Sequence, residues 1–64
     1  MTGAQIEKVL SGDALIEYES DWFEFFKTEK DGRHTFISLE YGNVFHATRN
    51  ALLHSSEFIF TERP

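Results

Sequence analysis

The sequence predicts one small α+β domain, residues 1–64, with a short N-terminal helix followed by a four- to five-stranded antiparallel sheet or small open barrel. Three observations lead to this fold class. Apolar residues first recur at the spacing of a helix and then alternate with polar residues as in strands, and Asp31-Gly32 marks a tight hairpin turn. A chain of 64 residues has room for one domain only.

The first predicted element is a short helix over residues 3–11. Thr2 and Gln5 have the spacing of a capping box, in which each side chain accepts a hydrogen bond from an otherwise unpaired backbone N–H. The apolar residues of its one stripe are Ile6, Val9 and Leu10. Gly12 can adopt the left-handed conformation that ends many helices. Because so short a helix is unstable alone in water, we expect it to pack against the rest of the domain.

The next segments alternate with the period of strands. Residues 14–20 form the first predicted strand, and the aromatic-rich residues 22–30 and the following residues 33–41 form the next two. Asp31 and Gly32 separate the last two. Asp-Gly is favoured in a type I′ turn, because both central residues of that turn need a positive φ. The sequence therefore predicts a two-residue hairpin turn at this point.

The predicted turn fixes which residues face each other across the hairpin. Counted outward from the turn, Phe26 pairs with Ile37 and Trp22 pairs with Tyr41. The face predicted to form the core carries Trp22, Phe26, Ile37, Leu39 and Tyr41. The other face is predicted to carry Phe23, Phe25 and Phe36. Three phenylalanines are too many for a freely solvated surface, so we expect the helix, another strand or a partner to cover them.

Residues 42–56 fit two interpretations. In the first, Gly42-Asn43 is a second hairpin turn that leads into a fourth strand, residues 44–49, and then a helical turn. In the second, Asn43 caps a helix. The β-branched and aromatic start of the segment favours the strand. Residues 57–62 alternate again and form the last predicted strand.

Charge and composition exclude several classes of protein. Eleven acidic residues against six basic ones give a net charge of −5, so a nucleic-acid binder, which needs a basic surface, is not expected. The absence of cysteine excludes disulfides and thiolate metal sites. No apolar segment approaches the ~18 residues of a membrane span, and no signal peptide is visible. We therefore expect a cytoplasmic protein that does not bind membranes.

No group of residues has the sequence pattern of a catalytic or metal site. His46, His54 and Glu57 are residue types that bind zinc, but their spacing matches no known ligand pattern. The serines lack the G-x-S-x-G turn that exposes a nucleophile. We therefore expect no enzymatic activity, no metal and no cofactor.

An acidic segment is the clearest candidate for a binding surface. Residues 13–24 contain five carboxylates and no lysine or arginine. If residues 14–21 are extended, Glu17, Glu19 and Asp21 project from one face at intervals of about 6.6 Å. This interval is of the same order as the phosphate spacing of a nucleic-acid strand, so the row could occupy the basic groove of a nucleic-acid enzyme. The alternative is a solvated edge whose charges prevent pairing with other sheets.

Aromatic residues beside these acids complete the predicted site, because aromatic side chains dominate protein–protein interfaces. The residues predicted to bind a partner are Glu17, Glu19, Asp21, Trp22, Phe23, Phe25 and Phe36. Trp22 belongs to both predictions, since a small domain also needs its aromatic residues for the core.

These observations favour a non-catalytic protein-binding or inhibitory module. Small acidic inhibitors of phages and other mobile elements are similar in size, charge and lack of catalytic groups. The expected partner is a larger protein such as a nucleic-acid enzyme, and the phenylalanine face predicts a homodimer. One alternative is an oligomeric small-barrel module that binds nucleic acid through aromatic rings and the basic residues Lys27, Lys30 and Arg33. The other is a purely structural, self-assembling subunit.

Overall fold

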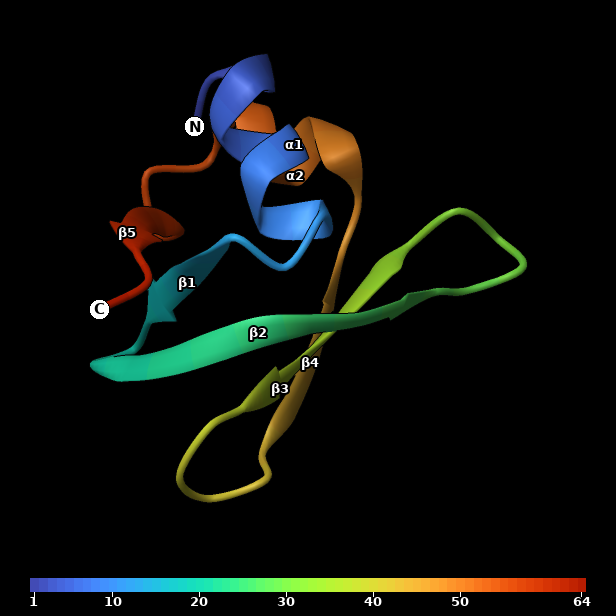
Figure 1. Cartoon of the computed structure of the whole chain (residues 1–64). Helices are drawn as coiled ribbons and strands as arrows, with labels where there is room; N and C mark the ends of the chain where they lie inside the picture. Colours follow the sequence, from blue (N-terminus) through green and yellow to red (C-terminus); the bar gives the residue numbers. More distant parts are fainter.

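A computed structural model describes residues 1–64 and confirms the predicted fold class (Figure 1). In chain order the elements are α1 (Gly3–Leu10), β1 (Ala14–Tyr18), β2 (Asp21–Thr28), β3 (His34–Ser38), β4 (Val44–Ala47), α2 (Arg49–His54) and β5 (Ile59–Glu62). The strands form one antiparallel sheet in the order β4-β3-β2-β1-β5, which remains open. Figure 1 shows α1 and α2 together on one side of a strongly twisted sheet, in which β3 and β4 cross the line of β2. Neither helix has the length and apolar character that crossing a membrane requires.

Helix α1 forms as predicted, and its cap explains why it starts where it does. The hydroxyl of Thr2 accepts a hydrogen bond from the backbone N–H of Gln5 (3.1 Å), and Oε1 of Gln5 accepts one from the N–H of Thr2 (3.0 Å). Ile6 and Val9 are fully buried. The helix ends one residue earlier than predicted, and Gly12 follows with a φ of 89°.

The first strand is shorter than predicted, and this breaks up the acidic row. β1 ends at Tyr18, and Glu19 and Ser20 form a two-residue turn with φ values of 51° and 63°. Tyr18 pairs with Asp21 across the turn. The prediction that three acids project from one extended strand is therefore wrong: Glu17 lies on β1, Glu19 in the turn and Asp21 on β2. No glycine or asparagine marks this turn in the sequence.

The loop between β2 and β3 is longer than the predicted two-residue turn. It spans residues 29–33, and Gly32 (φ 93°) is the only left-handed residue in it. The N–H of Glu29 donates to the carbonyl of Arg33 (2.7 Å), and the N–H of Gly32 donates to the carbonyl of Glu29 (3.0 Å). Asp31 keeps a negative φ and turns its carboxylate toward the backbone N–H and Nε of Arg33 (3.0 and 2.8 Å).

The register of this hairpin differs from the prediction, but the grouping of side chains survives. The loop shifts the pairing by one residue, so that Thr28 pairs with His34. A bulge between Phe25 and Lys27 shifts it by one more, so that Phe25 pairs with Phe36. Because side chains alternate with a period of two, the two shifts together return residues 22–25 to their predicted sets. Lys27 and Thr28, which lie between the bulge and the loop, undergo only one shift and change sets.

The prediction is wrong about which of the two faces forms the core. The residues assigned to the core are largely exposed: Trp22 (49%), Phe26 (61%), Leu39 (41%) and Tyr41 (72%), with Ile37 half-buried. Phe23 (5% exposed) and Phe36 (0%) are buried instead, because Ile6, Val9 and Leu52 of the two helices pack with them in the core cluster. Two of the three coverings expected for the phenylalanine face are observed: the helices, and another strand, since Phe45 of β4 packs against Phe23 and Phe36. We call this face the inner face and the opposite one the outer face.

Aromatic rings fill much of the core. Phe45 stacks on Phe36 and Phe58, with ring centroids 4.9 and 5.3 Å away, and Tyr18 and Phe23 lie against it at 4.9 and 4.7 Å. Aromatic pairs contribute roughly 0.5–1.5 kcal/mol each beyond the area they bury. These five rings, the aromatic cluster, help to stabilise a domain with no disulfide.

Residues 42–56 contain both a strand and a helix. The favoured interpretation is correct in that a fourth strand, β4, pairs with β3, but β4 ends two residues earlier than predicted. The predicted two-residue turn at Gly42-Asn43 is wrong: β3 already ends at Ser38, and a loop of residues 39–43 joins the two strands. A short helix, α2, follows where a single helical turn was expected. Thr48 caps α2 by accepting a hydrogen bond from the N–H of Ala51 (3.1 Å). Asn43 caps no helix; its carbonyl accepts a hydrogen bond from the N–H of Ser38 (2.7 Å) and closes the β3–β4 loop.

The last strand, β5, starts two residues later than predicted and pairs with β1 at the edge of the sheet. Its alternation is as predicted. Phe58 and Phe60 pack against the core cluster, whereas Ile59 is exposed on the outer face.

Candidate protein-binding surface

Ion pairs involve nearly every basic residue of the chain. Five of the six bases lie 2.8 to 3.9 Å from a carboxylate: Lys8–Glu62, Lys27–Glu29, Arg33–Asp31, Arg49–Glu7 and Arg63–Glu24. Exposed pairs of this kind stabilise a fold by about 1 kcal/mol at most. Their main effect is on the charge pattern, because six acids and a single base, Lys30, are left without an ion pair.

The unpaired acids gather at one end of the molecule. Five of the six lie beside the β1–β2 turn, in the β3–β4 loop and before β5: Glu17, Glu19, Asp21, Glu40 and Glu57. We call these five residues the acidic end. The sixth, Asp13, follows α1 and accepts a hydrogen bond from the hydroxyl of Ser11 (3.1 Å).

Two tyrosines show how close these carboxylates are to one another. The negative charge of Glu19 is the largest cause that raises the pKa of Tyr18 above its usual value. A hydrogen bond and the charge of Glu40 raise the pKa of Tyr41 in the same way. A second acid adds to each shift, Glu57 at Tyr18 and Asp21 at Tyr41, so each tyrosine lies in the field of two carboxylates of the acidic end.

The structure brings the three predicted acids together around a turn. Glu17 is half-buried on the outer face, where it pairs with Trp22 on one side and Ile59 on the other. Glu19 is exposed in the turn. Asp21 accepts a hydrogen bond from the N–H of Trp22 through Oδ1 (2.8 Å). The acids therefore surround a protruding turn instead of lining a strand edge.

Of the predicted aromatic site residues, only Trp22 lies on the surface. Phe23 and Phe36 belong to the core, and Phe25 is half-buried, with its ring edge-on to Phe36 and His34. Phe36 has no exposed surface with which to contact a partner while the domain is folded, and Phe23, 5% exposed, reaches the surface only at a hollow described below.

Two residues that the sequence assigned to the core join Trp22 on the surface. The N–H of Leu39 donates to the carbonyl of Trp22 (3.0 Å), and Tyr41 lines a shallow hollow together with Trp22. Gly42-Asn43, a turn signal directly after Tyr41, could have placed this tyrosine in a loop. The exposed apolar residues next to the acidic end are Trp22, Leu39, Tyr41, Val44 and Ile59. We call four of them, Trp22, Leu39, Tyr41 and Ile59, the outer apolar patch.

A hollow of about 360 Å³ lies between the β1–β2 turn and the start of β4. Its lining residues are Tyr18, Glu19, Asp21, Phe23, Asn43, Val44 and Phe45. Three rings of the aromatic cluster and a valine provide apolar wall, and two unpaired carboxylates provide negative charge. We call it the acid-lined hollow.

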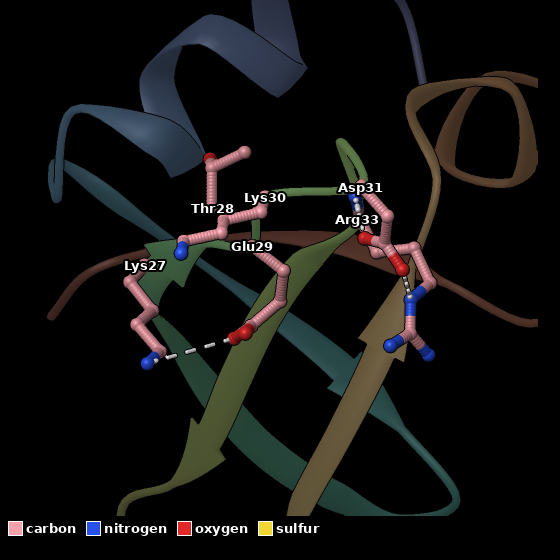
Figure 2. A pocket seen from close by; sticks show the side chains of 6 residues that line it. All are labelled: Lys27, Thr28, Glu29, Lys30, Asp31 and Arg33. Atoms are coloured by element: carbon pink, nitrogen blue, oxygen red, sulfur yellow. Dashed lines mark hydrogen bonds and ion pairs between the residues drawn. The ribbon is translucent and has the colours of Figure 1, made fainter.

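The largest hollow, about 410 Å³, lies at the β2–β3 loop and has a different character (Figure 2). It is lined only by Lys27, Thr28, Glu29, Lys30, Asp31 and Arg33. Figure 2 shows Lys27 directed toward Glu29 and Arg33 toward Asp31, the two ion pairs already described. Binding sites for small molecules usually have an apolar wall, which this loop surface lacks.

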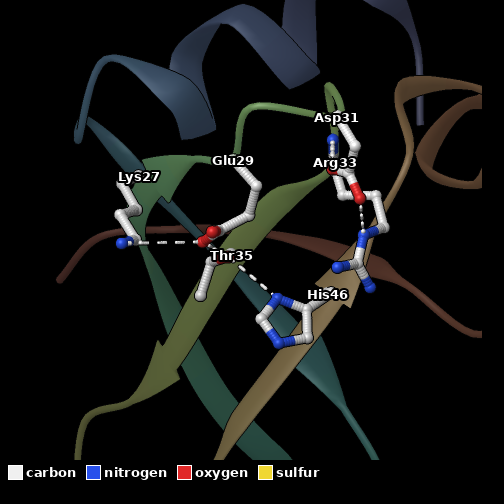
Figure 3. Close-up of polar contacts among 6 residues, drawn as sticks. All are labelled: Lys27, Glu29, Asp31, Arg33, Thr35 and His46. Carbon is white, nitrogen blue, oxygen red and sulfur yellow. Dashed lines mark hydrogen bonds and ion pairs between the residues drawn. The ribbon is translucent and has the colours of Figure 1, made fainter.

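A buried hydroxyl joins three segments beside this loop (Figure 3). The hydroxyl of Thr35 on β3 donates to Oε2 of Glu29 (2.6 Å) and lies 2.8 Å from Nδ1 of His46 on β4. Because a hydroxyl has one proton, Nδ1 of His46 carries the hydrogen of the second bond. The contacts satisfy the buried hydroxyl and fasten the loop to both strands. No three His, Asp or Glu side chains in the structure are grouped so that they could hold a metal ion.

No protein-family model, curated protein or solved structure matches this chain. The charge pattern and the exposed side chains are the features of this chain that bear on its function.

Proposed function

We propose that this protein is a non-catalytic binding module that docks on a basic surface of a larger protein. One observation carries the proposal: the unpaired acids gather at one end, beside the exposed side chains of the outer apolar patch. Each of the two features supplies a different part of an interface.

The outer apolar patch supplies contact area. Trp22 is the only tryptophan of the chain, and about half of it is exposed, next to the exposed ring of Tyr41. Tryptophan and tyrosine are the residue types most enriched among side chains that contribute strongly to protein binding. Burial of these two rings by a partner would remove apolar surface from water without any rearrangement of the domain.

The acidic end supplies direction and partner choice. Complementary charge accelerates the encounter of two proteins and discriminates against partners of the same sign. A surface that binds nucleic acid is basic, so a nuclease, polymerase or repair enzyme offers the complementary charge. Because the acids surround a protruding turn, we propose that the turn enters such a surface, with inhibition as the consequence.

The nucleic-acid alternative loses support from the structure. Lys27 and Arg33, two of the three bases on which it depended, have carboxylate partners. The homodimer remains a prediction, but its original basis is gone because Phe23 and Phe36 are covered by the protein's own helices. Sedimentation equilibrium at micromolar concentration tests it directly.

The proposal is tested with two variants that each lose three carboxylates. The first changes the acidic end: Glu17→Gln, Glu19→Gln and Asp21→Asn. The matched control changes acids elsewhere: Glu7→Gln, Asp13→Asn and Glu62→Gln. With a partner isolated on immobilised wild-type protein, we expect the first variant to associate at least about tenfold more slowly at low salt and the control to resemble wild type. Equal association rates for the first variant and wild type would contradict the proposal.

A second pair of variants tests the outer apolar patch. Trp22→Ala should weaken affinity for the same partner by about tenfold or more, since hot-spot truncations cost at least 1–2 kcal/mol. Phe26→Ala is the control, because Phe26 is an exposed ring on the same sheet near the opposite loop. If both variants lose the same affinity, the outer apolar patch is not the surface that contacts the partner. Circular dichroism establishes that each variant is folded.

A further inference from the structure

We infer that the acid-lined hollow is the subsite that receives one long basic side chain, an arginine or a lysine, of the partner protein. The inference rests on the proposed function and names the chemistry of its central contact. It follows from the lining residues of the hollow, the state of its carboxylates and its size.

The wall of the hollow is apolar but already packed. Phe36 and Phe58 both stack on Phe45 with their rings nearly parallel to it (21° and 13°). It can therefore offer the hollow mainly its edge, together with the side chain of Val44 and the ring of Tyr18. Such a wall suits an aliphatic chain better than a flat ring that needs to stack.

The carboxylates of the hollow are free to bind a cation. Neither Glu19 nor Asp21 has an ion-pair partner. Asp21 uses Oδ1 to accept the hydrogen bond from the N–H of Trp22, and its Oδ2 accepts none within the protein. Glu19 is held at the hollow by the left-handed turn, where it also raises the pKa of Tyr18.

Arginine and lysine combine the two properties that this lining selects. Their aliphatic stems bury against apolar surface while their charged ends reach polar groups. Their hydrogen bonds to carboxylates are charge-assisted and stronger than neutral ones. An anion is repelled here, and a neutral apolar side chain leaves both carboxylates unpaired. A volume of about 360 Å³ lies at the lower end of the range for small-molecule sites, which suits one side chain.

The first test uses amino-acid probes in place of the partner. N-acetyl methylamides of arginine and lysine are titrated into the full-length protein, and the NMR signals of the Tyr18 and Phe45 rings are followed. The neutral controls are the citrulline compound, which has nearly the shape of arginine, and the norleucine compound, which has only the stem. We expect saturable shifts with arginine and lysine and at least about tenfold weaker binding of both controls. If citrulline binds as well as arginine, or if no probe shifts these rings, the inference is wrong.

The second test uses two variants with equal loss of charge at the same end. Glu19→Gln with Asp21→Asn removes the carboxylates that line the hollow, whereas Glu40→Gln with Glu57→Gln removes two that do not. We expect the first variant to lose arginine binding by about tenfold or more and the second to retain most of it. Equal losses would mean that only the general negative field attracts the probe, and would overturn the subsite.

These outcomes separate the subsite from the proposed function. Suppose that affinity for the partner falls with Trp22→Ala, and falls equally when Glu19 and Asp21 or when Glu40 and Glu57 are neutralised. The proposed docking surface is then supported and the subsite is contradicted. If arginine binds in the hollow but none of these substitutions changes affinity for the partner, the subsite is supported and the proposed docking surface is contradicted.

Discussion

At the scale of single residues, the buried hydroxyl of Thr35 has the clearest expected effect on stability. Thr35→Val keeps the shape of the side chain but leaves the carboxylate of Glu29 and Nδ1 of His46 without this partner. We expect the free energy of unfolding to fall by about 1 kcal/mol, the net worth of a hydrogen bond, because water can reach half-buried Glu29 and exposed His46. Urea denaturation measures it. Thr28→Val, at an exposed hydroxyl bonded to His34, is the control and should change little; equal effects would contradict the role of Thr35.

We expect His34 to make the domain less stable in mild acid. Burial is the main cause that lowers its pKa below 6.5, the charge of Arg49 adds to it, and Glu7 opposes it. Between about pH 6.5 and the lower folded-state pKa the unfolded chain binds more protons, so stability rises with pH there. The stability that neutral His34 contributes to the folded state is complete above about pH 6.5 and is lost as the pH falls through the folded-state pKa.

Thermal melts between pH 5 and 8 test this expectation. His34→Gln should flatten the acid side of the stability profile, whereas His54→Gln, at an exposed position, should leave it unchanged. Identical slopes for wild type and His34→Gln would show that another group causes the acid response.

At the scale of elements, local signals predicted local structure well. The capping box of α1 needs only Thr2 and Gln5, and alternation correctly sorted the residues of β2 and β3 into two sets, apart from Lys27 and Thr28 beyond the bulge. The position of α1 decides which of the two sets is buried. Its residues Ile6 and Val9 pack in one cluster with Phe23 and Phe36, which are far from them in the chain. Both sets contain aromatic residues, so hydrophobicity alone could not decide between them. Six-residue α2 is too short to show a helical period.

The β1–β2 turn combines backbone strain with a role in the candidate site. Glu19 and Ser20 both have positive φ, a conformation that costs ordinary residues roughly 1–2 kcal/mol each. Asn-Gly is the pair best suited to such a turn. Glu19→Asn with Ser20→Gly should therefore raise the free energy of unfolding by about 1–2 kcal/mol and the melting temperature by several degrees.

The same double variant should weaken binding, because it removes the carboxylate of Glu19 from the acid-lined hollow. Ser20→Gly alone is the control: it relieves strain at one position and keeps the charge. If the double variant is more stable and binds arginine as well as wild type does, the carboxylate of Glu19 does not contribute to binding in the acid-lined hollow.

At the scale of the whole molecule, composition predicted the excess of acids but not its arrangement. Glu24 belongs to the acidic segment in sequence, yet it pairs with Arg63, which lies 39 residues away. Glu40 and Glu57 come from distant loops to join the acidic end. Pairing and gathering of this kind follow from the strand order, which brings β5 beside β1, and no local pattern in the sequence records it.

The gathered acids should also make the stability of the whole domain depend on salt. Like charges held close together destabilise the folded state by a few tenths of a kcal/mol per contact. Glu40→Gln with Glu57→Gln should therefore raise the free energy of unfolding by about 0.5–1 kcal/mol at low salt. The gain should disappear in 1 M NaCl, where screening shortens the range of charge interactions to ~3 Å.

Taking the difference between variant and wild type cancels the effect of salt on the five ion pairs, which both proteins share. Lys30→Gln is the control, because it removes the one unpaired base, at the loop between β2 and β3, and should change stability by less than about 0.5 kcal/mol. Urea denaturation at 20 mM and 1 M NaCl gives both differences. A gain that persists in 1 M NaCl would show that the substitutions act through packing, and that the acidic end exerts no appreciable repulsion on itself.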